Sequence, residues 1–138
     1  MIAIIDYGVG NLFSLKSSLA AIGREAVVTG DRAVLRAASH VILPGVGAFG
    51  DAAARLRAVG MAEAVLEAAA AGKPVLGICL GMQLLLERSF EYGEHPGLGL
   101  IPGEVRPIRD VIPAGLAVPH MGWNALRFPA ERPRSPIF

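Results

Sequence analysis

Four short apolar runs constrain the fold of this sequence more than any other feature. None of them alternates apolar and polar residues, and such continuous runs are typical of strands buried on both faces of a parallel sheet. The segments between them carry apolar residues at helical spacing. This alternation of strand and helix predicts an α/β fold with a parallel sheet covered by helices. The four runs are Ile2–Ile5, Ala26–Val28, Val41–Leu43 and Pro74–Ile78.

Capping residues set the bounds of the expected helices. Asn11 precedes a helix with apolar residues as far as Ile22, and Asp31 precedes a short helix that ends at Ala38. Side-chain oxygens at such positions accept hydrogen bonds from the free N–H groups of the first turn. Three more helices are expected: one capped by Asp51 that ends at Ala58, one over Met61–Ala71 that stops at Gly72, and one over Leu80–Arg88.

The last third of the chain has a different character. Eight of the ten prolines lie between Ser89 and Phe138, and no good helical pattern occurs there. Short antiparallel strands are expected at 98–101, 104–108 and 118–128. Because the chain ends with a loop followed by the apolar pair Ile137-Phe138, we expect residues 1–138 to be a single domain that is incomplete at its C-terminus. An ordinary frayed tail is the alternative.

Size and composition exclude several classes of protein. The hydrophobic residues make up 53% of 138 residues, which rules out a disordered chain. The net charge is +1 with no long basic tract, so neither nucleic acid nor a membrane surface is an expected partner. The uncharged runs are too short to span a bilayer, and the first residues lead us to expect no secretory signal. The single cysteine forms no internal disulfide or cysteine-cluster metal site, and a cytoplasmic location is expected.

The segment Gly77-Ile78-Cys79-Leu80-Gly81 is the strongest chemical signal. It follows a predicted buried strand and opens a predicted helix, which is the context of a nucleophile elbow with cysteine in place of serine. Flanking glycines relieve the clashes of such a sharp turn, and the helix N-terminus favours the reactive thiolate. The backbone N–H of Leu80 is then directed at a developing oxyanion. The alternative is a structural cysteine buried among leucine and isoleucine.

Two glycine-containing loops follow other predicted strands. Pro44-Gly45-Val46-Gly47 has glycines that allow backbone N–H groups to approach a ligand, so it is a candidate for the second oxyanion donor, with a plain turn as the alternative. The loop from Asp6 to Asn11 has a G-x-G pattern, but Phe13 stands where a dinucleotide fingerprint has its third glycine. We therefore interpret it as a tight turn at the mouth of the site and expect no cofactor.

Together these segments resemble the triad-type (class I) glutamine amidotransferases. The active-site segment of that family is similar to residues 77–83, and its oxyanion segment is similar to residues 44–50. The segment from Asp6 to Asn11 and the run Pro119-His120-Met121-Gly122-Trp123-Asn124 narrow the resemblance to the glutaminase subunits of imidazole glycerol phosphate synthases. The resemblance implies an α/β doubly wound, mostly parallel sheet with helices on both faces, whose C-terminal part is missing here.

The resemblance also implies roles for individual residues. Cys79 attacks the side-chain amide of glutamine, forms a γ-glutamyl thioester and releases ammonia. The N–H groups of Val46 or Gly47 and of Leu80 form the oxyanion hole. Gln83 and the backbone of Gly47 hold the amino-acid end of glutamine. No metal or cofactor is implied.

A partner follows from the same resemblance. Members of this group dock as a heterodimer on a (β/α)₈-barrel cyclase subunit, which uses the ammonia to make imidazole glycerol phosphate and AICAR in histidine biosynthesis. His120, Met121, Trp123 and Asn124 are expected at this interface, which suits a tryptophan and a methionine. A core position is the alternative for Trp123.

The sequence departs from the family at the catalytic base. The family pairs its thiol with a histidine in a C-terminal His-Pro-Glu segment, and these 138 residues contain no such segment. We expect none of His40, His95 and His120 to replace it. The alternative functions are a catalytically inactive fragment, a partner-binding module of the same fold, and another thiol enzyme with a cysteine elbow.

Overall fold

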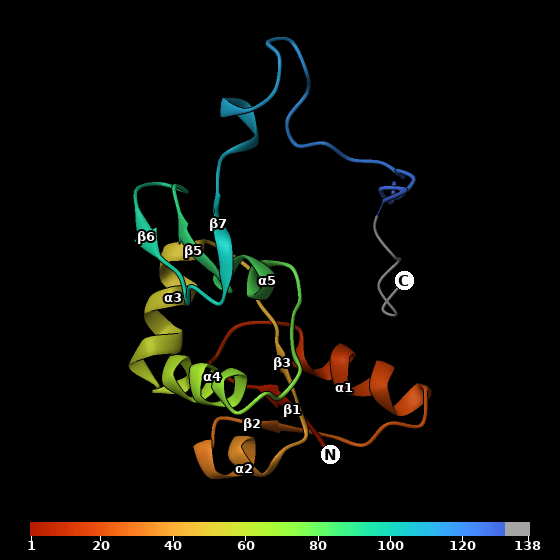
Figure 1. The fold of residues 1–138 in the computed structure, drawn as a ribbon, viewed down its shortest axis with the longest axis vertical. Coiled ribbons are helices and arrows are strands. Elements are labelled where there is room, and N and C mark those ends of the chain that lie inside the picture. The colour runs from red at the N-terminus through yellow and green to blue at the C-terminus, as the bar shows by residue number, and fades with distance from the viewer. Residues whose placement is uncertain (132–138) are drawn as a thin grey trace.

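The computed structural model describes residues 1–131 and contains two sheets with five α-helices (Figure 1). A single 3₁₀ turn, Ile108–Asp110, follows the last strand of this part of the chain. The elements are, in chain order, β1 (Ile2–Ile5), α1 (Leu12–Ala21), β2 (Ala26–Thr29), α2 (Arg32–Ala37), β3 (His40–Leu43), α3 (Phe49–Ala58), α4 (Met61–Ala70), β4 (Val75–Gly77), α5 (Leu80–Leu84), β5 (Leu86–Ser89), β6 (His95–Pro96) and β7 (Ile101–Val105).

The larger sheet is parallel and has the strand order β2-β1-β3-β4. Its strands correspond to the four apolar runs, so the predicted parallel α/β sheet is confirmed. β1 lies in the middle, where Ala3 pairs with Val27 of β2 and with Val41 of β3. Because all four strands run the same way, the loops that follow β1, β3 and β4 meet at one edge of the sheet.

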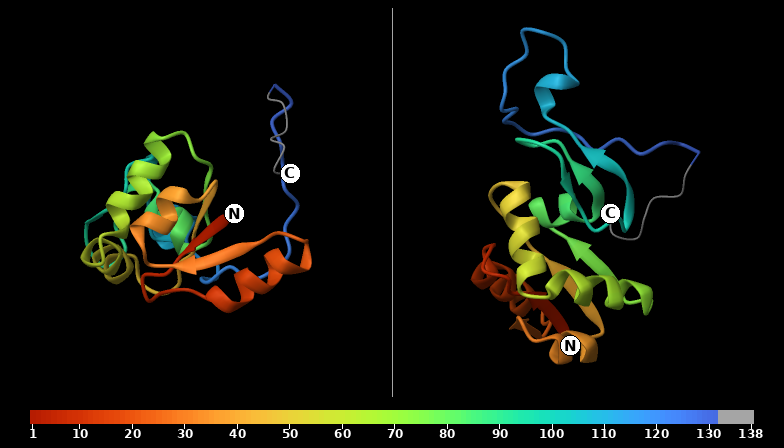
Figure 2. Two further views of the ribbon diagram at one scale, coloured as in Figure 1. Left: turned by 90° about the horizontal axis from the view of Figure 1, so that it is seen from below. Right: turned by 90° about the vertical axis from the view of Figure 1, so that its left-hand side faces the viewer.

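Helices cover the two faces of this sheet unequally. α2, α3 and α4 lie on one face and share the main apolar core with β1 and β3, whereas α1 lies on the other face (Figures 1 and 2). α1 contributes no fully buried residue. The largest fully buried side chains of this core are Ile5 of β1, Leu35 of α2, Val41 and Leu43 of β3, Phe49 and Leu56 of α3, Met61 and Val65 of α4, and Leu84 of α5.

Two of the predicted helix caps are confirmed and one is wrong. Asn11 Oδ1 accepts from the N–H of Ser14 at 3.2 Å, and Asp31 Oδ1 accepts from the N–H of Ala33 at 2.7 Å. Asp51 does not cap α3, which begins at Phe49 instead. A distant side chain accepts from the first N–H of α3 instead: Phe49 N–H donates to Glu91 Oε2 at 2.7 Å.

The predicted helix over 80–88 is correct only in its first half. α5 ends at Leu84, and the next residues form β5 in a second sheet of order β6-β5-β7. The helix stops because another segment takes its last carbonyls: Leu98 N–H donates to the Leu84 carbonyl at 2.8 Å, and Leu100 N–H donates to the Leu85 carbonyl at 2.9 Å. A distant segment therefore overrides the local helical pattern.

The strands expected in the last third are only partly correct. β7 overlaps the segments expected at 98–101 and 104–108, but it runs parallel to β5, and only β5 and β6 are antiparallel. The segment 118–128 contains no strand. In Figure 1 it belongs to the blue part of the chain that extends away from both sheets. Without a neighbouring strand, its apolar residues have no ladder to join.

The second sheet carries a stacked group of charges on its surface. The guanidinium groups of Arg88 and Arg106 lie 5.5 and 4.8 Å from the ring centre of Phe90. Both arginines also pair with Glu104, at 2.5 and 2.7 Å. Hydrogen bonds from Arg106 and Arg88 lower the pKa of Glu104. These contacts join β5 to β7 across the register shift between them.

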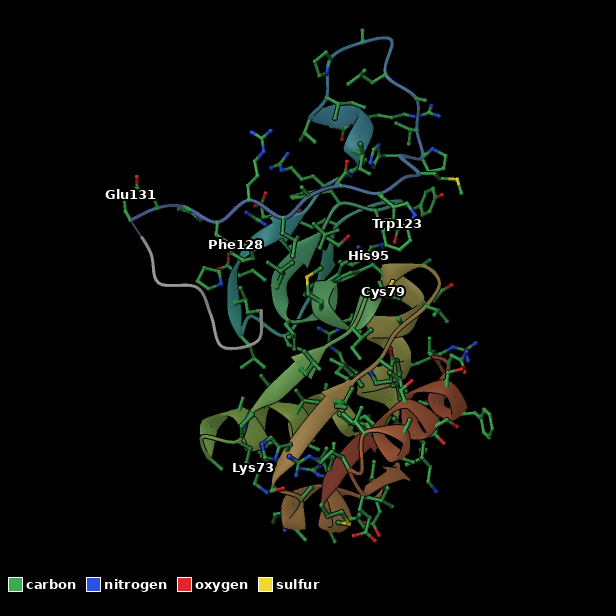
Figure 3. All side chains as sticks on the ribbon, turned by 90° about the vertical axis from the view of Figure 1, so that its right-hand side faces the viewer. Lys73, Cys79, His95, Trp123, Phe128 and Glu131 are labelled. Atoms are coloured by element: carbon green, nitrogen blue, oxygen red, sulfur yellow. The ribbon has the colours of Figure 1, made fainter. Side chains whose placement is uncertain are left out.

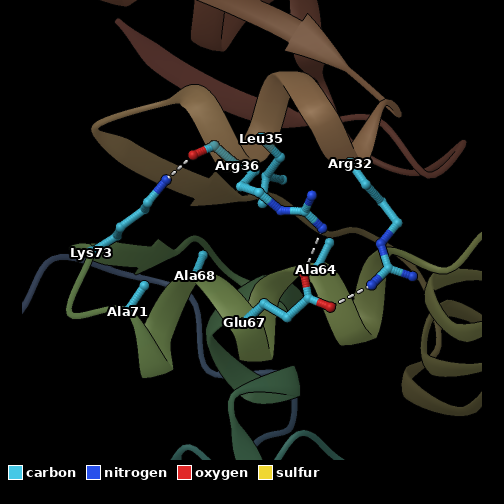
Figure 4. A pocket seen from close by; sticks show the side chains of 8 residues that line it. All are labelled: Arg32, Leu35, Arg36, Ala64, Glu67, Ala68, Ala71 and Lys73. Carbon is cyan, nitrogen blue, oxygen red and sulfur yellow. Dashed lines mark hydrogen bonds and ion pairs between the residues drawn. The ribbon is translucent and has the colours of Figure 1, made fainter.

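A pocket of about 190 Å³ lies between α2 and α4 (Figure 4). Glu67 accepts from Arg32 at 2.5 Å and from Arg36 at 3.4 Å. Lys73 Nζ donates to the carbonyls of Arg36 and Ala38, which are at the C-terminal end of α2. The charged groups of this pocket therefore pair within the protein, and they fix α2 to α4 at the end of the sheet opposite Cys79 (Figure 3).

β4 is an edge strand of the parallel sheet and lies beside an apolar groove. Leu76 is 42% exposed. The groove has a volume of about 770 Å³ and is lined mainly by apolar side chains, among them Leu66 of α4, Val75 of β4, Leu85 between α5 and β5, Leu100, and Ile101 of β7. No helix within residues 1–131 is both long enough and apolar enough to cross a membrane.

We expect the purified 138-residue chain to self-associate through this edge. An uncovered strand edge next to apolar surface is a template for pairing with another chain. Light scattering after size exclusion should give a mass well above 14.4 kDa. Leu76→Lys should shift the population toward monomer, whereas Val59→Lys, at a somewhat more exposed apolar position after α3, should not. A monodisperse monomer at all concentrations contradicts this prediction.

Candidate functional site

Cys79 lies in a sharp turn between β4 and α5, with φ 56° and ψ −120°. A positive φ is strained for any residue with a side chain, and such strain is common at functional sites. The side chain is exposed. The alternative of a buried structural cysteine is therefore wrong, and the strand–turn–helix geometry of a nucleophile elbow is present.

Two glycines make this turn possible. A Cβ on Gly81 would lie 1.9 Å from the carbonyl oxygen of Leu43, and a Cβ on Gly77 would lie 2.5 Å from the Cα of Met82. Ile78 N–H donates to the Leu43 carbonyl at 3.0 Å. The elbow is therefore packed backbone to backbone against the end of β3.

The loop 44–47 lies beside the elbow. A Cβ on Gly45 would lie 2.6 Å from the nitrogen of Gly81, so the two loops are in direct backbone contact. Beyond this contact the loop is open: Val46 is 54% exposed, and Gly47 has φ +92° with no atom near its Cβ position. The two predicted sources of oxyanion donors are thus neighbours at the carboxyl edge of the sheet.

Leu80 and Gln83 lie on α5 directly after Cys79. Leu80 is the first residue of the helix, and its N–H therefore has no acceptor within the helix. Gln83 N–H donates to the Cys79 carbonyl at 3.2 Å, and its side chain is half-buried one turn from the thiol. The structure therefore brings Cys79, Leu80, Gln83 and the loop 44–47 together.

The three histidines lie in different parts of the fold. His40 begins β3, at the opposite end of the sheet from Cys79, and its Nδ1 is 3.0 Å from Ser39 Oγ. The ring of His95 packs against Gly50 at the start of α3. His120 Nε2 is 2.7 Å from Asn124 Nδ2 in the segment beyond β7. Each histidine therefore has a structural contact of its own.

The residues expected at a partner interface lie at the surface. Met121 is 86% exposed, and Trp123 is fully exposed. Trp123 is therefore not a core aromatic residue. The side chains of His120 and Asn124 contact each other on either side of a bend at Gly122.

Sequence reasoning missed two residues that shape the site. Tyr7 is 4% exposed and donates its hydroxyl to the Pro44 carbonyl at 2.8 Å. Glu91 satisfies the N-terminus of α3, which directly follows the loop 44–47. These contacts span 37 and 42 residues, so no local pattern indicates them. Within residues 1–131, no three histidine, cysteine, aspartate or glutamate side chains gather as a metal site.

Comparisons with known proteins agree with this geometry. Residues 3–110 match the model of the CobB/CobQ-like glutamine amidotransferase domain. The chain is 54% identical to the imidazole glycerol phosphate synthase subunit HisH of Sulfurimonas denitrificans, over 96% of this chain and 64% of that protein. It is also 54% identical to HisH of Moorella thermoacetica, over 93% and 59%, and 48% identical to HisH of Aquifex aeolicus, over 93% and 60%. The chain thus spans about three fifths of the length of these relatives.

Solved structures confirm the fold. A crystal structure of a glutamine amidotransferase superposes with a TM-score of 0.65 at 23% identity, covering 77% of this chain and 56% of that one. A putative peptidase E from Listeria monocytogenes superposes with a TM-score of 0.59 at 16% identity, covering 72% and 62%. The family match covers most of the sequence, including the cysteine elbow and the loop beside it, and the chain belongs to the CobB/CobQ-like glutamine amidotransferase family.

Proposed function

We propose that this chain carries the nucleophile half of a glutaminase that supplies ammonia for imidazole glycerol phosphate synthesis. The observation that supports this proposal best is the exposed, strained Cys79 beside the open tip of the loop 44–47. In this proposal Cys79 Sγ attacks the amide carbon of glutamine, and the amide nitrogen leaves as ammonia after protonation. The relatives from Sulfurimonas denitrificans and Moorella thermoacetica are named as subunits of imidazole glycerol phosphate synthase, and this supports the proposed use of the ammonia.

The proposed oxyanion hole uses backbone donors from two neighbouring loops. The N–H of Leu80 has no acceptor within its helix, and the Val46–Gly47 tip is exposed next to it. Two such donors stabilise the negative oxygen of a tetrahedral intermediate more than they stabilise the amide of glutamine. Gln83 and the backbone of Gly47 are proposed to bind the amino-acid end of glutamine.

A chloroketone analogue of glutamine tests this proposal. Its alkylating carbon reacts with a thiolate by displacing chloride, so the reaction needs no proton donor. We expect one label on Cys79 by intact mass, protection by glutamine but not by asparagine, and no label on Cys79→Ala. Gln83→Ala should lose the protection while it keeps the wild-type rate with iodoacetamide. Labelling that glutamine does not slow contradicts a glutamine site.

We further propose that the segment from His120 to Asn124 docks on the cyclase subunit, which the resemblance makes a (β/α)₈ barrel. The exposure of Met121 and Trp123 supports this, because exposed aromatic residues and methionine are enriched in the centres of interfaces. The contact between His120 and Asn124 gives this short segment a defined shape before binding.

Trp123→Ala should weaken binding to the cyclase subunit about 30-fold, since a central tryptophan often contributes about 2 kcal/mol or more. Titration calorimetry with the isolated cyclase subunit measures this change. Val111→Ala is the matched control, because Val111 is an apolar residue that is 65% exposed in the part of the chain after β7 but lies outside residues 120–124. Equal affinities for the two variants would remove Trp123 from the interface.

A further inference from the structure

The hydroxyl of Tyr7 connects the loop after β1 to the loop after β3. Tyr7 is 4% exposed, and its hydroxyl donates to the carbonyl oxygen of Pro44 at 2.8 Å. The acceptor is the first residue of the loop 44–47, directly after β3 ends at Leu43. Burial raises the pKa of Tyr7 to about 12, so the phenol stays a neutral donor at all pH values at which the protein works.

Other backbone contacts hold the same peptide from different sides. A Cβ on Gly45 would lie 2.6 Å from the nitrogen of Gly81, and a Cβ on Gly10 would lie 3.1 Å from Pro44 Cβ. Residues 44 and 45 are thus held between the loop after β1 and the start of α5. The next two residues are not, because Val46 is exposed and Gly47 faces open space.

We propose that Tyr7 is a positioning residue that orients the 44–45 peptide and thereby directs the N–H groups of Val46 and Gly47 toward Cys79. This inference rests on the proposed function, which assigns those N–H groups to the oxyanion hole. A peptide unit is planar, so fixing the Pro44 carbonyl also fixes the N–H of Gly45 and the point from which the free tip starts. An oxyanion hole works only when its donors are in place before charge develops.

The test compares two reactions of Cys79 in the intact chain. With p-nitrophenyl acetate, Sγ attacks the ester carbonyl, the bond to p-nitrophenolate breaks, and the acetyl group stays on sulfur. This step builds an oxyanion, and its leaving group needs no proton. With iodoacetamide, Sγ displaces iodide and no oxyanion forms. Donors that stabilise an oxyanion therefore affect the first reaction and leave the second unchanged.

Tyr7→Phe should slow acylation by p-nitrophenyl acetate about tenfold, which is less than the ~10²–10³-fold loss of a whole oxyanion donor. The rate with iodoacetamide should stay within about twofold. Tyr92→Phe is the matched control, because Tyr92 is 92% exposed and should behave as wild type in both reactions. Replacing Tyr7 with para-aminophenylalanine, which keeps a donor at the ring end, should restore acylation; it also tests the proposal if Tyr7→Phe does not fold.

The outcomes separate this inference from the function on which it rests. If the wild-type chain acylates no faster than Cys79→Ala, the proposed oxyanion hole is wrong and the inference with it. If the wild type acylates but Tyr7→Phe is equally fast, only the role of Tyr7 is wrong. If Tyr7→Phe slows both reactions equally, or para-aminophenylalanine does not restore acylation, Tyr7 has a purely structural role and the proposal is overturned.

Discussion

Replacing Gly81 with alanine should lower the stability of the protein by about 3 kcal/mol, the upper part of the range for overpacking in a tight interior. The new Cβ would lie 1.9 Å from the carbonyl oxygen of Leu43 and 3.0 Å from the carbonyl carbon of Pro44. Both neighbours are backbone atoms, so no side chain can rotate away. The elbow and the end of β3 must move apart, at the place where the two loops of the site meet.

The melting temperature reports this loss. For a chain of this size we expect a decrease of about 10 °C. Far-UV circular dichroism is the suitable probe, because Trp123 is already fully exposed and its fluorescence would change little on unfolding. Gly122→Ala is the matched control: no atom lies within 4 Å of its Cβ position, and its backbone does not need a positive φ. Equal melting temperatures for the two variants would contradict the close packing of the elbow.

The first two thirds of the fold were predictable because local signals and tertiary contacts agree there. All four strands of the parallel sheet are continuous apolar runs, and β1 and β3 are buried as such runs predict, whereas the outer strands β2 and β4 are only partly buried. Asn11 and Asp31 cap their helices through contacts two or three residues away, which a sequence pattern can include. The elbow at Cys79 was predictable for the same reason, because its strand, glycines and helix are consecutive.

The second sheet was not predictable from local pattern. Leu85 and Leu86 continue the apolar run at the end of α5, and only the segment around Leu98 and Leu100, which takes the carbonyls of Leu84 and Leu85, ends the helix. β6 has two residues, and β7 contains a proline and a glycine that local propensity disfavours in a strand.

Sequence patterns also failed to indicate the residues that hold the loops of the candidate site in place, because these residues act through contacts that are distant in the sequence. Tyr7 and Glu91 are ordinary residues in their local sequence, and they become informative only when the fold places them against Pro44 and Phe49. Sequence patterns thus found the groups proposed to touch the substrate, and the structure added the groups that hold them.

The 138-residue chain by itself should release ammonia from glutamine slowly. Attack by Cys79 needs only its exposed thiol and the proposed oxyanion donors of Leu80 and the loop 44–47. Expulsion of the amide nitrogen needs a proton donor, since amide anions are poor leaving groups. General acid–base help of this kind contributes ~10²–10⁴-fold. His40 lies at the far end of the sheet, His95 packs on Gly50 and His120 contacts Asn124, and within residues 1–131 none of the three forms a hydrogen bond with Cys79.

The assay measures ammonia release from glutamine, with and without the cyclase subunit, against Cys79→Ala. We expect a rate close to that control in both cases, because the missing group is chemical and a partner that only reshapes the site does not provide it. Added imidazole should raise the rate of the wild type in proportion to its concentration, since it supplies the proton, and should leave Cys79→Ala unchanged. Turnover far above the control without imidazole would mean that His95 or His120 reaches the thiol, and His95→Gln and His120→Gln would then identify which.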